Sequence, residues 1–282
     1  MQLHKPGLAN RLAKAAAKPL SRIVCSSLLY KPARVADAYL NFLIGKGSGT
    51  GWDLQSEVSA AARWIRRPNP VLFDVGANVA GWTEGMLKRF EGAQAFLFEP
   101  SPGCQAVIRE KKLPRATLVP CALGDKPGGA PYYSSSATDG TASLYVRHDT
   151  PFSGLKYQAT TVQVRTLDEV IATLKLDFVD FVKMDIEGHE LYALRGAQQS
   201  LAAGKIGALS FEFGCGNINS RTYFRDFWDL LSGVGFSLWR ITLSGKEIPI
   251  SNYYEDHEYF RGATNYVAVS NKAQSTVAEK CS

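Results

Sequence analysis

Apolar runs without polar alternation recur along the chain and are separated by segments of helical spacing. They predict β-strands at residues 71–75, 95–98, 116–121, 178–184, 206–213, 235–241 and 264–270. In the first run, VLFDV, the continuous apolar pattern indicates burial on both faces. Helices are predicted at 53–66 and 82–90, and Pro68 and Pro70 end the first of them. This alternation predicts an α/β fold with a mainly parallel sheet between layers of helices.

The alternation stops between Gly124 and Thr166, where glycine, proline and serine are frequent. Short β-prone pieces at 131–134 and 160–165 predict an inserted β-hairpin at a sheet edge. Aromatic side chains of this insertion could stack on a sugar ring or simply cover core: Tyr132, Tyr133, Tyr145 and Tyr157.

A nucleoside site is predicted where the first two strands end. Asp74 lies near the end of the first strand, and the small residues Gly76 and Ala77 follow it with Asn78. Ligands of open α/β sheets bind beyond the carboxyl ends of the strands, where small residues let the backbone approach closely. The second strand ends at Glu99, whose carboxylate could accept hydrogen bonds from both ribose hydroxyls.

The turn after the first strand distinguishes between nucleosides. A dinucleotide fingerprint has a glycine where this chain has Asn78, and the turn contains no basic residue. This favours a nucleoside with a zwitterionic tail, such as S-adenosylmethionine, whose ammonium Asp74 could face directly or through water. An NAD-dependent oxidoreductase with a degenerate fingerprint is the alternative.

Seven short segments in a fixed order carry a family resemblance: FDVGAN, FEPSP, CALGD, TLDEV, VKMDIEGHE, LRGA and LSFEF. In this order they resemble the FkbM-type family of S-adenosylmethionine-dependent methyltransferases over about residues 52–270. The resemblance implies a Rossmann-like, seven-stranded class I methyltransferase fold whose last strand runs antiparallel. The family has a glycine two places after the asparagine, whereas this chain has Ala80 there and Gly81 one place later.

Residues at strand ends form the predicted cofactor site. Ala122 and Asp125 follow the third strand and are placed to meet the adenine ring, although Asp125 could equally be a turn residue. The complete set of predicted cofactor contacts is Asp74, Gly76, Ala77, Asn78, Glu99, Pro100, Ala122 and Asp125.

Four residues after the next two strands are the predicted catalytic group: Asp185, Glu187, His189 and Glu212. Methyl transfer to a hydroxyl needs alignment of the acceptor and removal of its proton. His189 could be the base, since its ordinary pKa is near neutrality, or it could be a solvent-facing residue at a helix N-terminus. Alternatively, Asp185 and Glu212 could hold Mg²⁺ that activates the acceptor hydroxyl.

The acceptor is constrained by one missing motif. The chain has no [DNS]-P-P-[FYW] tetrad after the fourth strand, the signature of many amino-group methyltransferases, and the carboxylate-rich DIEGHE favours an oxygen acceptor. The resemblance implies hydroxyls of sugars, glycolipids or other small molecules. An RNA methyltransferase and a non-catalytic nucleoside-binding protein are the alternatives.

Positive charge is concentrated at the N-terminus. Residues 1–50 contain eight lysines and arginines against Asp37 alone, a net charge of +7, so the remainder carries −1. A body without net positive charge argues against a nucleic-acid partner. Apolar residues between Leu8 and Leu28 recur at near-helical spacing, although Pro19 interrupts them. This basic amphipathic segment could contact an anionic membrane, suit a lipid-linked acceptor, or pack on the domain.

Composition divides the chain into a basic helical extension with a glycine-rich linker (1–50), a methyltransferase domain (51–270) and a flexible tail (271–282). The five cysteines are odd in number and lack a C-x-x-C pair, which fits free thiols in a reducing compartment. No apolar run reaches the ~18–20 residues that cross a bilayer, and no secretory signal is evident. We expect a cytoplasmic protein, peripheral at the inner membrane surface if the N-terminal segment binds lipid. The sequence leaves the oligomeric state open.

Overall fold

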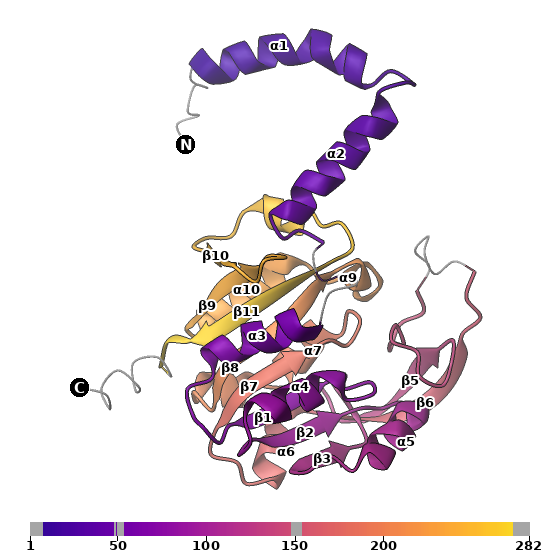
Figure 1. Ribbon diagram of the computed structural model, residues 1–282, viewed down its shortest axis with the longest axis vertical. Coiled ribbons are helices and arrows are strands. Elements are labelled where there is room, and N and C mark those ends of the chain that lie inside the picture. Colours follow the sequence, from indigo (N-terminus) through magenta and orange to yellow (C-terminus); the bar gives the residue numbers. More distant parts are fainter. Residues whose placement is uncertain (1–7, 48, 50–53, 148–153, 273–282) are drawn as a thin grey trace.

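An eight-stranded, mainly parallel β-sheet forms the centre of the protein (Figure 1). It is described here from a computed structural model of residues 8–47, 49, 54–147 and 154–272. The strand order is β10-β9-β11-β8-β7-β1-β2-β3. The strands are β1 (Val71–Val75), β2 (Gln94–Phe98), β3 (Ala116–Val119), β7 (Val179–Met184), β8 (Ile206–Gly214), β9 (Phe236–Ile241), β10 (Glu247–Ile250) and β11 (Ala263–Ser270).

The predicted Rossmann-like methyltransferase topology is confirmed. All seven predicted strands are present, β1, β2, β3, β7 and β8 run parallel, and β11 pairs antiparallel with both β8 and β9. The strand count needs a correction, because β10 pairs with β9 and adds an eighth strand. Pro249 lies inside β10, and a proline in a short run argues against a strand except at a sheet edge, where β10 lies.

Helices cover both faces of the sheet. Alternate residues of β1 point to opposite sides, so that Leu72 joins one apolar cluster and Phe73 and Val75 join the other. The first cluster includes residues of α3 (Leu54–Trp64), α4 (Gly81–Arg89) and α5 (Pro102–Lys111). The second includes residues of α6 (Leu167–Thr173), α7 (Glu190–Arg195), α8 (Gln198–Ala202) and α10 (Phe224–Gly233). This two-sided burial explains the continuous apolar runs of the central strands.

The insertion forms a separate small sheet. Strands β4 (Ala122–Leu123), β5 (Gly128–Ser134) and β6 (Gln158–Arg165) pair in the order β4-β6-β5, with β5 and β6 as the antiparallel hairpin. The predicted hairpin is therefore present, but it does not extend an edge of the main sheet. The chain leaves β3 at Val119, and Ala122 and Leu123 pair in parallel with β6. The strand predicted at 116–121 is divided for this reason.

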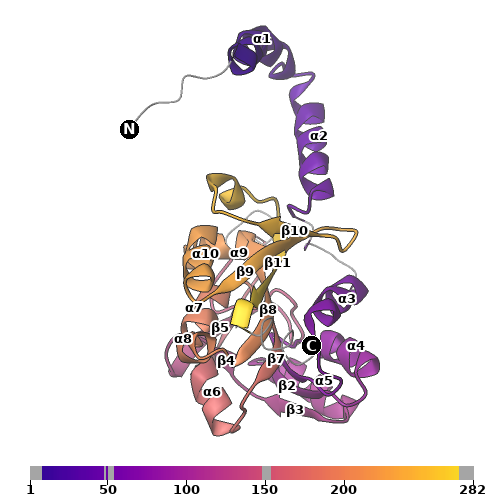
Figure 2. The same ribbon diagram turned by 90° about the vertical axis from the view of Figure 1, so that its left-hand side faces the viewer.

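Two helices precede the domain and project from it: α1 (Leu8–Val24) and α2 (Tyr30–Leu43) (Figures 1 and 2). Pro19 lies inside α1. In the part of the chain that the structure describes, no helix combines the length and apolar character needed to span a membrane. Two short elements, α9 (Cys215–Ser220) and η2 (Glu255–Glu258), complete the fold. The domain start predicted near Trp52 and residues 273–282 of the predicted tail lie outside the described residues.

The glycine-rich stretch after α2 packs on the domain where it is described, in contrast to the flexible linker that its composition predicts. Lys46 is buried, with its ammonium 2.8 Å from the Asp256 carboxylate. The amide of Gly47 donates to the Thr264 hydroxyl at 2.8 Å, and the amide of Gly49 donates to the Ala263 carbonyl at 2.8 Å. These contacts place the base of the two helices beside the start of β11.

Candidate active site

A cavity of about 270 Å³ opens beyond the carboxyl ends of β1, β2 and β7. Its volume is just below the range of about 300–1,000 Å³ typical of small-ligand sites. Many of the predicted site residues line it: Gly76, Ala77, Asn78, Glu99, Pro100, Ala122, Asp185, Glu187 and His189. Three others, Asp74, Asp125 and Glu212, are not in the lining. Nine of the twelve predicted site residues therefore share one cavity, although most of the residues that line it were not predicted.

The turn after β1 is shaped by an unusually close backbone approach. Gly76 has a φ of +78°, and a Cβ atom on it would lie 1.9 Å from the Asp185 carbonyl oxygen. Asn78 and Ala80 also have left-handed φ values, 48° and 64°. Ala80 thus adopts a conformation that favours glycine, at the position where the family has glycine.

Asp74 lies too deep for one of its two predicted roles, the direct contact with the ligand ammonium. Its side chain is fully buried beneath the cavity, and one carboxylate oxygen accepts a hydrogen bond from the Thr83 hydroxyl at 2.6 Å. The other lies 3.6 Å from the ammonium of Lys183. Because Asp74 does not line the cavity, it cannot face a ligand ammonium directly without rearrangement. The reason is that Asp74 points toward α4, the helix that carries Thr83.

Lys183 is a site residue that sequence reasoning missed. Its ammonium lies between Asp74 and Asp185, 3.5 Å from the Asp185 carboxylate, and donates to the Gly76 carbonyl at 3.2 Å. Burial lowers the pKa of Lys183, but the carboxylates of Asp185, Asp74 and Glu57 outweigh it and raise that pKa. Glu57 of α3 also lines the cavity. A lysine inside a buried strand run was the available signal, because an unpaired charge there would be costly.

Glu99 is positioned by two backbone amides. Its carboxylate accepts from the Asn78 amide at 2.7 Å and from the Ser101 amide at 2.8 Å. Burial raises the pKa of Glu99 to about 7, although both hydrogen bonds favour the ionised form. An acidic side chain held in this way at the end of β2 fits the ribose of a nucleoside.

The segment after β3 supplies an apolar wall and one departure from prediction. Cys121, Ala122 and Leu123 line the cavity at the position predicted for adenine. Asp125 is exposed and lies outside the lining, so the structure places it as a turn residue. The chain turns away at Gly124 to enter the small sheet, and Asp125 is left at the surface.

His189 lies beside this apolar segment. A Cβ atom on Gly124 would be 3.1 Å from its Nε2 atom, and its Nδ1 atom is 2.8 Å from the Tyr145 hydroxyl. The ring stacks on Tyr192 with centroids 4.8 Å apart. Burial lowers the pKa of His189 to about 4. A neutral, tightly packed imidazole is a weak proton acceptor at neutral pH, and this environment disfavours His189 as the base.

Three of the predicted catalytic carboxylates form a cluster. Asp185, Glu187 and Glu212 each offer an oxygen, and these oxygens lie within 4.8 Å of one another. Burial, together with the nearby Asp185 carboxylate, raises the pKa of Glu187 to about 8 and raises that of Glu212 well above its ordinary value. Of these three, Asp185 and Glu187 line the cavity. The cluster therefore contains a carboxylate at the cavity wall that takes up a proton near neutral pH.

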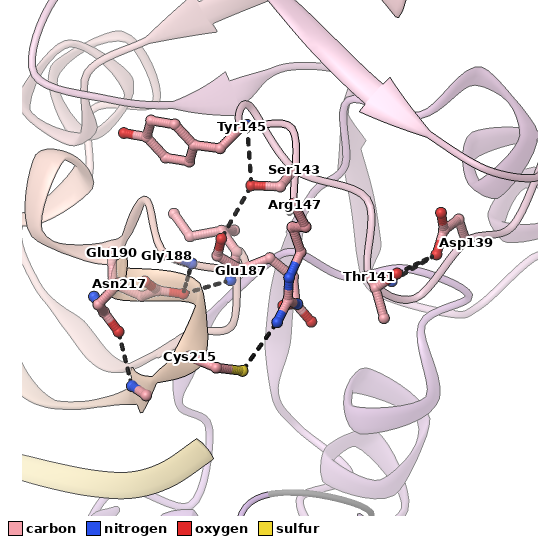
Figure 3. Close-up of polar contacts among 12 residues, drawn as sticks. Asp139, Thr141, Ser143, Tyr145, Arg147, Glu187, Gly188, Glu190, Cys215 and Asn217 are labelled. Atoms are coloured by element: carbon pink, nitrogen blue, oxygen red, sulfur yellow. Dashed lines mark hydrogen bonds and ion pairs between the residues drawn. The ribbon is translucent and has the colours of Figure 1, made fainter. Parts of the chain in front are cut away.

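The insertion holds Glu187 in place (Figure 3). The buried guanidinium of Arg147 contacts the Glu187 carboxylate at 2.5 Å and Cys215 Sγ at 2.9 Å. The Ser143 hydroxyl donates to the Glu187 carbonyl at 3.0 Å. Glu187 itself has a left-handed φ of 54°, a strained conformation of the kind that concentrates at functional sites. Ser143, Tyr145 and Arg147 lie in a turn-rich stretch whose sequence gave no signal for this role.

Glu190 fixes the other side of the Glu187 loop. Its fully buried carboxylate accepts from the amides of Ile186 at 2.9 Å and Gly188 at 3.2 Å (Figure 3). These bonds tie the loop to the first turn of α7, so that both sides of Glu187 are anchored.

Comparison with known families decides the assignment. The sequence profile described as the methyltransferase FkbM domain matches residues 74–238, which is more than half of the chain. The chain belongs to the FkbM methyltransferase family. The match begins at the strand end that carries Asp74 and extends into β9, so this family domain includes the insertion and the carboxylate cluster.

Individual relatives are more distant. The FkbM-family chain is 27% identical over 149 residues to the 2-O-methyltransferase NoeI of Sinorhizobium fredii (strain NBRC 101917 / NGR234), which covers 49% of this chain and 61% of that protein. The chain thus spans less than two thirds of that relative. Methyltransferase FkbM of Methylobacillus flagellatus KT is 19% identical with a TM-score of 0.44, over 76% of this chain and 47% of that one. A predicted O-methyltransferase, Atu636 of Agrobacterium tumefaciens, is 13% identical with a TM-score of 0.39, over 78% and 81%.

Proposed function

We propose that the protein transfers a methyl group from S-adenosylmethionine to a hydroxyl of a sugar, a glycolipid or another small molecule. Support comes first from family membership. The cavity adds that Glu99, held by the amides of Asn78 and Ser101, is ready to accept hydrogen bonds from a ribose. The small residues Gly76 and Ala77 allow close approach of the ligand, and Ala122 and Leu123 offer an apolar surface to a base.

The presence of a carboxylate that can take the proton of a hydroxyl favours an oxygen acceptor. S-adenosylmethionine, when bound, supplies an activated methyl group. A hydroxyl acceptor must lose its proton during the transfer, and we assign this proton to the Glu187 carboxylate. Glu187 lines the cavity, and because burial raises its pKa, its carboxylate, once ionised, is a stronger proton acceptor than an ordinary carboxylate. Arg147 orients it through their ion pair. This placement of Glu187 is the observation that carries the proposal.

The similarity to a 2-O-methyltransferase points the same way. Over the 149 shared residues the identity is 27%, which supports O-methylation as a class and leaves the acceptor to experiment. An RNA acceptor is disfavoured by the charge of −1 outside residues 1–50, because tight RNA binding depends on neutralising phosphates. We expect the protein to act in the cytoplasm.

Calorimetric titration of the full-length protein with S-adenosylmethionine and with S-adenosylhomocysteine tests the first half of the proposal. Binding of both in the micromolar range is expected. If neither binds, the chain is a nucleoside-binding protein of another kind or a non-catalytic relative.

The second half is tested by incubating the protein with a panel of oligosaccharides, glycolipids and RNA in the presence of a cofactor carrying an isotopically labelled methyl group. The carbon resonance of the product distinguishes an O-methyl from an N-methyl group. Label in RNA alone, or in nitrogen positions alone, would contradict the proposed acceptor.

Glu187→Gln tests the assigned base. Removal of a general base lowers kcat by about 10²–10⁴-fold, while affinity for the cofactor should be unchanged. Glu169→Gln, on the surface beside Arg165, is the matched control and should keep wild-type kcat. Equal activity of Glu187→Gln and wild type at all pH values would exclude Glu187 as the base.

The predicted Mg²⁺ site deserves separate treatment because the structure brings Asp185 and Glu212 together, with Glu187 as a third oxygen donor. Oxygen donors suit Mg²⁺. However, Lys183 already pairs with Asp185 and Arg147 with Glu187, so two of the three carboxylates already have a cationic partner. The donor set is therefore a poor fit, and we propose a reaction without a metal step. Activity that EDTA abolishes and Mg²⁺ restores would reverse this conclusion.

A further inference from the structure

The N-terminal arm, defined as residues 8–44, exposes large apolar side chains that no other described part of the chain covers. No residue of α2 is buried, and Figures 1 and 2 show both helices standing away from the domain. Each of the large apolar residues exposed on the arm has at least 39% of its surface accessible to solvent. They are Leu20, Ile23, Val24, Leu28, Leu29, Tyr30, Val35, Tyr39, Leu40, Leu43 and Ile44. So many exposed apolar side chains on one segment indicate an interaction site.

The arm is fixed to the domain through its polar face. Asp37 of α2 forms an ion pair with Arg261, and the Asn41 side chain donates to Asp37. Val35, Tyr39 and Leu43 follow at a spacing of four and lie on the opposite face of the helix. The contact with Arg261 therefore turns this apolar face away from the domain.

Basic residues accompany the apolar ones. Lys18 and Arg22 on α1 and Lys31 and Arg34 on α2 are all exposed. Asp37 is the only acidic residue among the first 50, and it pairs with Arg261. Two copies of the arm packed together would bring these like charges into contact, whereas an anionic lipid surface offers both counter-charge and an apolar interior.

We propose that the N-terminal arm binds an anionic lipid bilayer, with its apolar side chains inserted at the headgroup level and its basic residues among the headgroups. The inference extends the function proposed above to a lipid-linked acceptor. In the stretch that follows the arm, a Cβ atom on Gly49 would lie 3.1 Å from the Glu212 carboxylate, so this stretch reaches the carboxylate cluster. Bilayer binding through the arm therefore tethers the domain that contains the cavity to the membrane.

The test is co-sedimentation of the full-length protein with vesicles of phosphatidylcholine alone and with added phosphatidylglycerol. Binding to the anionic vesicles, weakened by salt, is expected. The double variant Lys18→Glu/Arg22→Glu should bind at least about fivefold more weakly for each basic residue replaced. Lys88→Glu, an exposed lysine on α4, is the charge control and should bind as wild type does.

A matched pair tests the apolar part. Ile23→Glu should lose vesicle binding, whereas Ile218→Glu should not, although the two isoleucines are 57% and 59% exposed. Equal binding to neutral and anionic vesicles, or equal losses in the two isoleucine variants, would overturn the proposal. The proposal would also be overturned if the wild type did not bind vesicles and formed a dimer in sedimentation equilibrium that Ile23→Glu dissociates. Cofactor titration of each variant separates this failure from failure of the methyltransferase proposal, because the arm does not line the cavity.

Discussion

The ammonium of Lys183 lies 3.6 Å from the Asp74 carboxylate, and the two side chains are only 11% and 0% exposed. A buried charge that loses its partner costs far more than the pair contributes. Lys183 therefore compensates a charge at the floor of the cavity, and its neighbours on either side are the turn at Gly76 and the cluster at Asp185.

Lys183→Met should lower the free energy of unfolding by about 3–5 kcal/mol, because it leaves Asp74 buried without its cation. Urea denaturation measures the loss. The double variant Asp74→Asn/Lys183→Met removes both charges and should recover most of the stability. If the double variant is no more stable than Lys183→Met, the pair is not the source of the loss.

Gly76→Ala should abolish cofactor binding and destabilise the fold. The added Cβ would lie 1.9 Å from the Asp185 carbonyl, and the φ of +78° disfavours any side chain. Calorimetry and thermal unfolding measure the two effects. Gly233→Ala is the matched control: no atom lies within 4 Å of its added Cβ, and the residue belongs to helix α10. That variant should be as stable as wild type or more so by up to about 1 kcal/mol.

Glu99→Gln should weaken binding of S-adenosylmethionine by roughly 10–100-fold, since a carboxylate that accepts from two amides is replaced by a group with one acceptor. Wild-type affinity should rise with pH up to about 7, where burial sets the pKa of Glu99, and then level off. The ionised form accepts the ribose hydroxyls, which gives this direction. If the affinity of the wild type for S-adenosylmethionine does not change between pH 5 and pH 8, a range that spans this pKa, the assignment of Glu99 is contradicted.

Glu187 should make the unliganded protein less stable as pH rises. Its pKa is raised from 4.5 to about 8 in the folded state. Between these two pH values the carboxyl of Glu187 is therefore protonated in the folded protein and ionised in the unfolded chain. Stability therefore falls with pH between these two values, by at most about 1.4 kcal/mol per pH unit for one proton. Glu187→Gln mimics the protonated form and should show a shallower decline in urea midpoints. An unchanged slope would contradict the raised pKa.

The sequence predicted the buried strands and the residues that line the turns after β1 and β2, because those signals are local. A continuous apolar run indicates a strand buried on both faces, and a run of small residues indicates a turn where the backbone approaches another group closely. It did not predict which way a polar side chain turns once it is buried. Asp74 was expected to face the ligand ammonium directly or through water, and its buried carboxylate contacts Thr83 and Lys183.

Contacts between segments distant in the chain were equally out of reach. Arg147 meets Glu187 across 40 residues, and Tyr145 meets His189 across 44. No periodicity in a turn-rich stretch indicates such pairs. The same holds for Asp125, whose exposure depends on the turn into the small sheet, and for β10, whose strand character depends on its neighbour β9.

Every second residue along one stretch of the insertion makes a specific contact with the loop after β7: Ser143 with the Glu187 carbonyl, Tyr145 with His189 and Arg147 with the Glu187 carboxylate. The two segments therefore cannot be exchanged independently between relatives. A chimera that grafts a foreign insertion onto this domain to change acceptor choice must transfer these three side chains together, or supply a β7 loop from the same donor.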